Sequence, residues 1–256
     1  MVASVTTHLF KMRIDVYLAE NGFVLSRTEA KRFIDEGAVF VNGKPINKPS
    51  LNVDGTEDIT VDKSIKQFVS RGGIKLQGAL ADFSVSPRGR LCIDIGASSG
   101  GFTDCLLQSG AAHVIAVDSG SGQLAEPLRQ DSRVTVFENY NARYMKPEDF
   151  DYSPDLAVMD VSFISATYII PSVFDILADN ADFICLIKPQ FEVGRSGLGK
   201  GGIVKDSKAR DFAVKKVVDF AAATGFRVDG VKQSSIKGGD GNVEFLAHFV
   251  KVKGVS

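Results

Sequence analysis

Short apolar runs recur along the chain from residue 91 onward, and stretches with apolar positions three and four residues apart lie between most of them. The short runs are typical of buried strands, and the three-and-four spacing is typical of amphipathic helices. The predicted strands cover residues 91–95, 113–118, 133–137, 155–160, 182–188, 227–236 and 243–252. Their alternation with helices predicts an α/β fold with a Rossmann-like, mostly parallel sheet. No helix fits between the last two strands, so we expect the seventh strand to be antiparallel, in a hairpin with the sixth.

The residues before position 62 follow a different pattern, with two short helices ahead of short extended segments. Residues 13–22 place apolar side chains at helical spacing, and a second helix begins at a capping box formed by Ser26 and Glu29. Residues 38–46 predict two strands joined by an Asn-Gly turn, which favours a tight hairpin. This pattern is typical of a small α+β domain. The expected boundaries are 12–62 for the small domain, 63–70 for a linker and 71–254 for the larger domain.

Composition indicates a soluble globular protein and argues against a membrane-spanning, disulfide-rich or metal-binding one. The 256 residues are 44% hydrophobic and 24% charged, which is ordinary for a soluble globular protein. The formal net charge of −1 predicts no general attraction to nucleic acid or membrane, so any basic surface must be local. No apolar run is long enough to span a bilayer and no signal peptide is recognisable, so we expect a cytoplasmic protein without a membrane partner. The three cysteines lack C-x-x-C spacing, which argues against disulfides and against a bound metal.

Basic and acidic side chains are segregated in the small domain. Arg27, Lys31, Arg32 and Lys44 lie in its first part, and a run of acidic residues follows position 53. The stretch "SRTEAKRFIDEGAVFVNGKPI" resembles the S4 RNA-binding domain, a module also found in a ribosomal protein and in pseudouridine synthases. The resemblance implies that the basic helix and the turn at Lys44 contact structured RNA.

A glycine-rich turn follows the first strand of the larger domain, in "CIDIGASSGGFTD" at residues 92–104. Open α/β sheets bind ligands at the carboxyl ends of their strands, and glycine lets the backbone approach a cofactor closely. The turn lacks the middle glycine of the dinucleotide pattern G-x-G-x-x-G and the Gly-Lys-Ser/Thr of a P-loop. Asp94, Gly96 and Gly100 instead match D/E-x-G-x-x-x-G, a pattern typical of methyltransferases that use S-adenosylmethionine (SAM).

The predicted SAM contacts extend beyond this turn. Asp118 ends the next predicted strand, where a carboxylate binds ribose hydroxyls, and residues 139–143 lie where an adenine ring is expected. The predicted cofactor-binding residues are Asp94, Gly96, Ala97, Ser98, Gly100, Gly101, Asp118, Asn141 and Asp160.

The sequence argues against methyl transfer to a base. The segment "MDVSF" at 159–163 has the acid of amino-group methyltransferases without their prolines, and no cysteine lies in a predicted catalytic loop. His113 and His248 lie within predicted strands, so we expect them to be structural. Lysines and carboxylates remain at the ends of predicted elements: Lys75, Asp160, Lys188 and Glu244. We expect these four to converge where the carboxyl ends of the parallel strands meet.

These four residues resemble the Lys-Asp-Lys-Glu catalytic tetrad of the FtsJ-like ribose 2′-O-methyltransferases. Together with the S4-like domain and the stretch "FVSRGGIKL", they make the chain similar to the TlyA family, also called hemolysin A, over residues 12–254. The resemblance implies SAM-dependent 2′-O-methylation of ribosomal RNA, at cytidines of the 16S rRNA, the 23S rRNA or both, with ribosomal subunits as partners. The expected RNA contacts, the last two in a glycine-rich loop, are Arg27, Lys31, Arg32, Lys44, Arg71, Arg195 and Lys200.

The chemistry assigns a hypothetical role to each member of the tetrad. A ribose 2′-hydroxyl must lose its proton as it attacks a methyl group, and a lysine with a pKa near 10.4 is mostly protonated at neutral pH. Burial or a neighbouring cation lowers such a pKa. In our hypothesis Lys188 accepts the proton, Asp160 and Glu244 orient Lys188, and Lys75 positions the hydroxyl. Alternatively, Lys188 stays charged and stabilises the developing alkoxide.

Three other interpretations of the whole chain compete with methyl transfer. The first is a non-catalytic RNA-binding protein that retains a SAM site, and the second is a hemolysin that acts on membranes. The third is a hydride-transferring dehydrogenase, which the glycine pattern disfavours.

Overall fold

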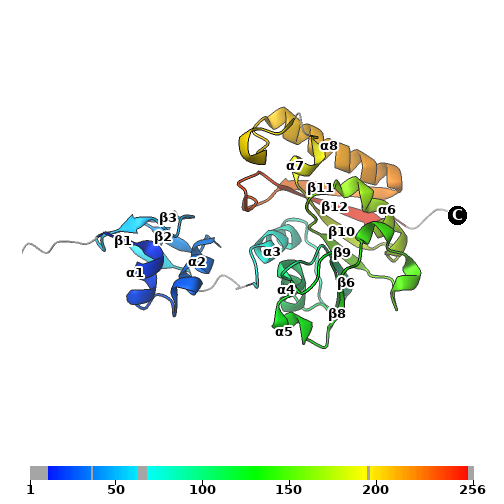
Figure 1. Ribbon diagram of the computed structural model, residues 1–256. Coiled ribbons are helices and arrows are strands. Elements are labelled where there is room, and N and C mark those ends of the chain that lie inside the picture. The colour runs from blue at the N-terminus through cyan, green and yellow to red at the C-terminus, as the bar shows by residue number, and fades with distance from the viewer. Residues whose placement is uncertain (1–10, 36, 63–67, 195–196, 253–256) are drawn as a thin grey trace, which may run out of the picture. The chain divides into compact units, whose positions relative to one another are not determined.

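The chain folds into two compact units that divide between Gln67 and Phe68 (Figure 1). The computed structural model describes residues 11–35, 37–62, 68–194 and 197–252. Of the segment predicted as a linker, residues 63–67 lie outside the described residues, and Phe68 is buried in the core of the second unit. Across the described ranges, no helix is long and apolar enough to cross a membrane.

The first unit is the small α+β domain that the sequence predicts. Its elements are β1 (Met12–Arg13), α1 (Ile14–Glu20), α2 (Arg27–Asp35), β2 (Val39–Val41), β3 (Lys44–Pro45), β4 (Asn52–Val53) and β5 (Ile59–Val61). Strand β1 pairs antiparallel with β4, and β2 lies between β3 and β5 in a second antiparallel sheet. The apolar stripes of the two helices supply Ile14, Leu18, Phe33 and Ile34 to its core.

Local sequence explains the start of α2 and the turn of the hairpin. Ser26 Oγ accepts a hydrogen bond from the Glu29 N–H (3.1 Å), and the Glu29 carboxylate accepts one from the Leu25 N–H (2.6 Å). The capping is reciprocal, but the carboxylate reaches one residue further back than in a standard capping box. Asn42 and Gly43 both have positive φ (51° and 73°), as the tight turn between β2 and β3 requires.

The second unit is built around a seven-stranded sheet (Figure 1). Its strands are β6 (Leu91–Ile95), β7 (His113–Val117), β8 (Val134–Phe137), β9 (Leu156–Met159), β10 (Asp182–Ile187), β11 (Phe226–Gln233) and β12 (Phe245–Lys251). Its α-helices are α3 (Gly72–Asp82), α4 (Gly101–Gln108), α5 (Glu126–Arg129), α6 (Ile170–Ile176), α7 (Pro189–Glu192) and α8 (Ser207–Thr224). Its short 3-10 helices include η1 (Ala142–Tyr144), η2 (Pro147–Asp149), η3 (Ala166–Tyr168) and η5 (Lys200–Gly202).

Strand pairing confirms the predicted parallel sheet with an antiparallel seventh strand. The order is β11-β12-β10-β9-β6-β7-β8, and the pairs from β10 to β8 are all parallel. Strand β12 is antiparallel to β11 and also to β10, so it lies between them rather than at the edge of the sheet. The observed β11 ends at Gln233, earlier than predicted, and the loop that follows leads to Glu244.

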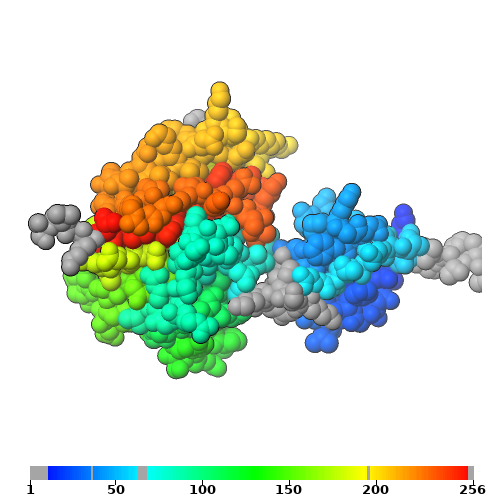
Figure 2. Space-filling model, turned by 180° about the vertical axis from the view of Figure 1, so that it is seen from behind, coloured from blue at the N-terminus to red at the C-terminus, as the bar shows by residue number. Residues whose placement is uncertain are grey.

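Helices cover both faces of this sheet and complete the core. On one face, α3 and α4 pack Leu76 and Leu106 against the strands, and α5 packs there as well. On the other face, α6 and α8 contribute Ile170 and Val217. In Figure 2, α3 (teal) lies beside the C-terminal hairpin (orange to red). The two layers of helices explain why the parallel strands are apolar on both faces.

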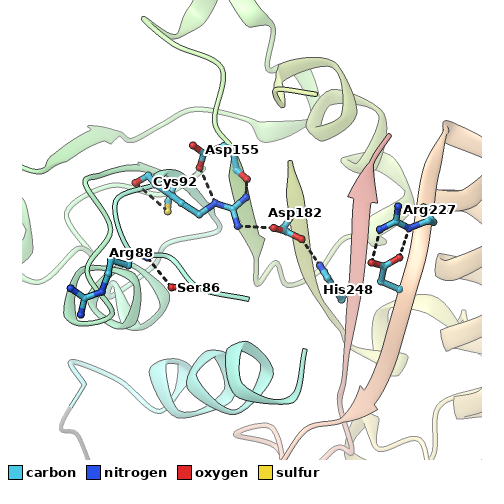
Figure 3. A network of polar contacts seen from close by, with 9 residues as sticks. Ser86, Arg88, Cys92, Asp155, Asp182, Arg227 and His248 are labelled. Carbon is cyan, nitrogen blue, oxygen red and sulfur yellow. Dashed lines mark hydrogen bonds and ion pairs between the residues drawn. The ribbon is translucent and has the colours of Figure 1, made fainter. Parts of the chain in front are cut away.

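A network of charged side chains joins strands at the amino end of the parallel sheet (Figure 3). Arg90, just before β6, lies 3.1 Å from Asp155 (Nε to Oδ1) and donates to Asp182 from Nη1 to Oδ2 (2.6 Å). The other Asp182 oxygen lies 2.6 Å from Nε2 of His248 in β12. Because Asp155 precedes β9 and Asp182 begins β10, the network ties three parallel strands to β12. It lies at the end of the strands away from the glycine-rich turn.

Candidate active site

The glycine-rich turn between β6 and α4 packs so closely that larger residues would not fit. A Cβ at Gly96 would overlap the carbonyl oxygen of Asp160, which follows β9, and one at Gly100 would overlap Leu128. Both glycines also have positive φ (85° and 95°), a conformation that other L-residues adopt only with strain. The turn is therefore pressed against the carboxyl ends of the strands. Its backbone borders the cavities described below.

Asp118, which follows β7, orders this turn. Its Oδ2 accepts a hydrogen bond from the Ser98 N–H (2.8 Å), and its Oδ1 accepts one from the Gly120 N–H (2.7 Å). Ser98 has a positive φ of 48°, so the carboxylate stabilises a backbone that would otherwise be unfavourable. Asp118 is half-buried and lines a cavity beside the turn. The same carboxylate thus shapes the turn and faces the space expected for a ribose.

Asp94, in β6, lies beneath the turn and is fully buried. Burial raises its pKa to about 7, and the negative charges of Asp160 and Asp118 add to this effect. Thr103 in α4 opposes the shift, because its hydroxyl donates to Oδ2 of Asp94 (2.6 Å). Asp94 does not line any of the cavities described next. The structure therefore places it under the predicted cofactor site rather than on its surface.

Three neighbouring cavities lie along the carboxyl ends of the parallel strands. The first, of about 280 Å³, lies between the glycine-rich turn and the start of α3. The second, of about 450 Å³, extends past Asp118 to Asn141, and the third, of about 410 Å³, lies beside Glu244. Asp160 lines the first two cavities, and Ser162 lines all three. Because they share wall residues, the three cavities lie side by side, and we refer to them together as the depression.

The structure brings the four predicted catalytic residues to this depression as two ion pairs. Lys188 Nζ lies 2.5 Å from Oδ1 of Asp160, and Lys75 Nζ lies 2.5 Å from Oε2 of Glu244. Both lysines line the first and the third cavity. Glu244 therefore contacts Lys75, whereas the hypothesis from the sequence assigned it to orient Lys188.

All four charged side chains are at least partly buried, so each depends on its partner to offset the cost of leaving water. The Lys75 and Glu244 side chains are 9% and 3% exposed, and those of Lys188 and Asp160 are 12% and 22% exposed. Taking an ion out of water costs several kcal/mol, and only a close partner offsets that cost. Each amine is thus held in place by its carboxylate beside a cavity. Such an arrangement can bind a hydroxyl group and take up or stabilise charge on its oxygen.

Two residues of the depression escaped the sequence analysis. The Ser162 hydroxyl accepts a hydrogen bond from Lys188 Nζ (2.8 Å), so Lys188 has a second partner. Phe163 is 92% exposed, has a positive φ of 65° and lines the second and third cavities. Its ring lies 5.3 Å from that of Phe191. Both residues belong to "MDVSF", whose position directly after a strand end was a signal for such a role.

The predicted RNA contacts of the first unit lie at its surface. Lys31 and Lys44 are exposed, and Arg32 is half-buried. Arg27 pairs with the buried carboxylate of Asp15 (Nη2 to Oδ2, 3.3 Å), and its side chain is 57% exposed. Asp15 also accepts hydrogen bonds from Arg13, which the sequence analysis did not single out. A carboxylate with two such partners holds two guanidinium groups at one place on the surface.

The remaining predicted RNA contacts belong to the second unit. Arg71, directly before α3, lines the first cavity. Lys200 begins η5 and is exposed. Arg195 lies outside the described residues.

Possible metal ligands and cysteine thiols are the other groups to consider in the described part of the chain. Within it, no group of three or more His, Cys, Asp or Glu residues is arranged to hold a metal ion. Cys92, Cys105 and Cys185 are all buried, and burial raises the pKa of the Cys92 thiol to about 12. A thiol with so high a pKa is not a nucleophile near neutral pH.

Known proteins resemble the chain over nearly its whole length. The family model described as FtsJ-like methyltransferase matches residues 68–251, and the S4 domain model matches residues 12–59. The Mycobacterium tuberculosis protein named 16S/23S rRNA (cytidine-2′-O)-methyltransferase TlyA is 44% identical, covering 92% of this chain and 88% of the relative. Hemolysin A of Brachyspira hyodysenteriae is 42% identical, covering 93% and 100%. A solved structure from Streptococcus thermophilus, described as a candidate hemolysin, has a TM-score of 0.73 at 44% identity, covering 95% and 89%.

Proposed function

Because the chain belongs to the FtsJ-like methyltransferase family and carries an S4 domain, we propose that it transfers a methyl group from SAM to ribose 2′-oxygens of ribosomal RNA. Cytidines in the 16S rRNA, the 23S rRNA or both are the expected targets, as in the name of the Mycobacterium tuberculosis relative. The observation that carries this proposal is the presence of two ion pairs around one depression: the buried pair of Lys75 with Glu244 and the partly buried pair of Lys188 with Asp160.

The first and second cavities suit the cofactor. Their wall includes the Asp118 carboxylate, which fits two ribose hydroxyls, and the close-packed turn at Gly96, which leaves backbone open to a ligand. Asn141 and Ile169 border the far end of the second cavity, where an adenine ring would lie. When bound, SAM supplies an activated methyl group. The protein therefore needs to position the acceptor and manage one proton.

The third cavity suits the ribose acceptor. Lys75, Lys188 and Glu244 line it, so a 2′-hydroxyl placed there meets both amines. Asp160 and Ser162 hold the Lys188 amine in position. Once that amine has lost its own proton, it accepts the proton of the hydroxyl as the oxygen attacks; in its charged form it instead stabilises the negative charge that develops on the oxygen. Lys75, held by Glu244, binds the same oxygen and stabilises its growing negative charge.

Two further features support RNA as the substrate. The exposed ring of Phe163 borders the second and third cavities, where it offers a surface on which a base can stack. A target nucleotide in a folded rRNA helix would have to leave its stack to enter the third cavity. The first unit supplies Arg27, Lys31 and Lys44 for phosphate contacts.

Ribosomal subunits from cells that lack the protein provide the direct test. The purified protein is incubated with these subunits and methyl-labelled SAM, with Lys188→Ala in parallel, and the label is mapped by mass spectrometry of rRNA digests. We expect label on ribose 2′-oxygens with the wild type and loss of it with Lys188→Ala. Binding of SAM and RNA without transfer by the wild type would reject the proposal and favour a non-catalytic RNA-binding protein.

A further inference from the structure

A buried carboxylate joins the two loops that carry Asp160 and Lys188. Glu192 is the last residue of α7, one helical turn after Lys188, and is only 6% exposed. Its Oε1 accepts a hydrogen bond from the Ala166 N–H (2.8 Å), and its Oε2 accepts one from the Ser165 hydroxyl (2.6 Å). Ser165 and Ala166 end the loop that begins at Asp160. Glu192 thus fastens the loop after β10 to the loop after β9.

A third element adds to this junction. Lys216 in α8 donates from Nζ to Oε2 of Glu192 (2.9 Å) and to the backbone carbonyl oxygen of Glu192 (3.2 Å). The same amine lies within hydrogen-bonding distance of Ser165 Oγ (3.3 Å). The long helix α8 packs on the sheet through buried residues such as Val217, so it holds Lys216 in a fixed position relative to the sheet.

Both loops need such support, because their own structure is weak. Helix α7 has four residues and η3 has three, and helical turns this short are not stable alone. Phe163, between Asp160 and Ser165, has a positive φ that costs energy for an aromatic residue. A misplacement of about 1 Å at a reacting group lowers a rate on the order of 100-fold. The position of Lys188 relative to Asp160 therefore depends on what joins the loops.

We propose that Glu192 is a positioning residue, which sets the separation of Asp160 and Lys188 and so places the Lys188 amine at the reacting hydroxyl. The inference rests on the function proposed above. A well-packed apolar residue would stabilise the fold as well as a buried ion does. A carboxylate with three donors, from a backbone amide, a hydroxyl and an amine, adds direction as well as stability, because each hydrogen bond fixes a geometry.

The main test is Glu192→Gln, which keeps the size of the side chain and one acceptor oxygen. The amide nitrogen would replace either Oε2, which accepts from Ser165 and Lys216, or Oε1, which accepts from the Ala166 N–H. In both cases the junction loses its ion pair. We expect kcat for methyl transfer to fall at least about tenfold, whereas the KM for rRNA and the Kd for SAM change less than about twofold. The Kd is measured by calorimetry, which does not depend on activity.

A matched control lies at the other end of the same strand. Asp182 begins β10 and is also a carboxylate with two partners, Arg90 and His248, but it belongs to the network at the amino end of the sheet (Figure 3). We expect Asp182→Asn to lower the Tm by at least as much as Glu192→Gln while kcat stays within about twofold of the wild type. If kcat falls in proportion to Tm in both variants, Glu192 has only a structural role.

Ser165→Ala provides a second, milder variant. It removes the hydrogen bond to Glu192, together with the contacts of the same hydroxyl to Thr167 and Lys216, and leaves the hydrogen bonds of Ala166 and Lys216 to Glu192 in place. It therefore tests the junction even where Glu192→Gln does not fold. We expect kcat to fall several-fold at unchanged Kd for SAM. If the wild type is active and a folded Glu192→Gln or Ser165→Ala protein has the same kcat, the inference about Glu192 is wrong, whereas the proposed function stands. An inactive wild type overturns the proposed function and this inference with it.

Discussion

Lys188 is the residue at which two mechanisms differ, because its amine can act as a base or as a fixed positive charge. Arginine keeps the charge but does not give up its proton near neutral pH. We therefore expect Lys188→Arg to lower the single-turnover rate of methyl transfer about 100-fold, the lower end of what a general base contributes. Lys188→Ala, which lacks both base and charge, is the control for complete loss. A rate for Lys188→Arg close to that of the wild type would leave only the electrostatic role.

Asp94 makes the stability of the protein depend on pH. Its pKa in the folded protein is about 7, raised mainly by burial, whereas an unfolded aspartate has a pKa near 3.9. Between these values the folded protein holds a proton that the unfolded chain releases, so the free energy of unfolding falls as pH rises from about 4 to 7. At about 1.4 kcal/mol per pKa unit, the loss is at most about 4 kcal/mol.

Asp94→Asn isolates this contribution, because asparagine stays neutral at every pH. Urea unfolding at pH 5 and pH 7.5 should show a smaller fall in the free energy of unfolding for Asp94→Asn than for the wild type. An equal fall in both proteins would mean that Asp94 does not take up its proton in this range.

Gly96 combines a positive φ with a close contact, and these two effects can be separated. Gly96→Ala adds a Cβ that overlaps the Asp160 carbonyl, so we expect at least a tenfold loss of SAM affinity by calorimetry. Gly89→Ala is the control: its φ of 72° imposes similar strain, but nothing lies within 4 Å of an added Cβ. Both variants should lose about 1 kcal/mol or more of stability from strain. Equal SAM affinities in the two variants would show that the close contact at Gly96 is not needed.

Among the elements, the strands of the second unit are fixed at both ends by different kinds of contact. Arg90 joins β9 and β10 through Asp155 and Asp182 (Figure 3). Its side chain is 21% exposed, so Arg90→Met leaves half-buried Asp182 with only His248, and we expect a loss of about 2 kcal/mol in the free energy of unfolding. The measurement is urea unfolding at pH 7.

Arg227 is the matched control for Arg90. It pairs with Asp229 in the same view, but its side chain is 58% exposed. Exposed pairs contribute little, so Arg227→Met should change the free energy of unfolding by less than about 0.5 kcal/mol. Similar losses for both variants would indicate that burial does not set the strength of this network.

Across the whole molecule, the proposed chemistry belongs to one unit and much of the proposed RNA recognition to the other. The cavities suited to SAM are lined by residues of the second unit, whereas Lys31 and Lys44 are exposed on the first. We expect Lys31→Glu and Lys44→Glu each to weaken rRNA binding several-fold and to reduce its salt dependence, since each removes one phosphate contact. The Kd for SAM should not change.

Lys215→Glu, on the exposed face of α8, makes the same change of charge as these two variants. It should leave rRNA binding within about twofold of the wild type in filter-binding assays. If all three variants weaken binding equally, net charge rather than the surface of the first unit governs the interaction.

Much of this protein is determined by local sequence pattern. Apolar runs located the seven strands, and the resemblance to the FtsJ-like and S4 families is confirmed by the family models. The convergence of Lys75, Asp160, Lys188 and Glu244 could be predicted from the sequence, because each lies near the end of an element and the carboxyl ends of parallel strands share one edge. Spacing along the chain is enough to predict such an arrangement.

Tertiary structure alone decided which groups touch. Lys75 and Glu244 are 169 residues apart in sequence, and only the insertion of β12 beside β10 brings them together. The same packing pairs Glu244 with Lys75 rather than with Lys188, and it joins the loops that carry Asp160 and Lys188 through Glu192, which no motif marks. Periodicity encodes where an element begins and ends. The partner of a buried charge depends on how whole elements pack, because it must lie within a few ångströms after water has been excluded.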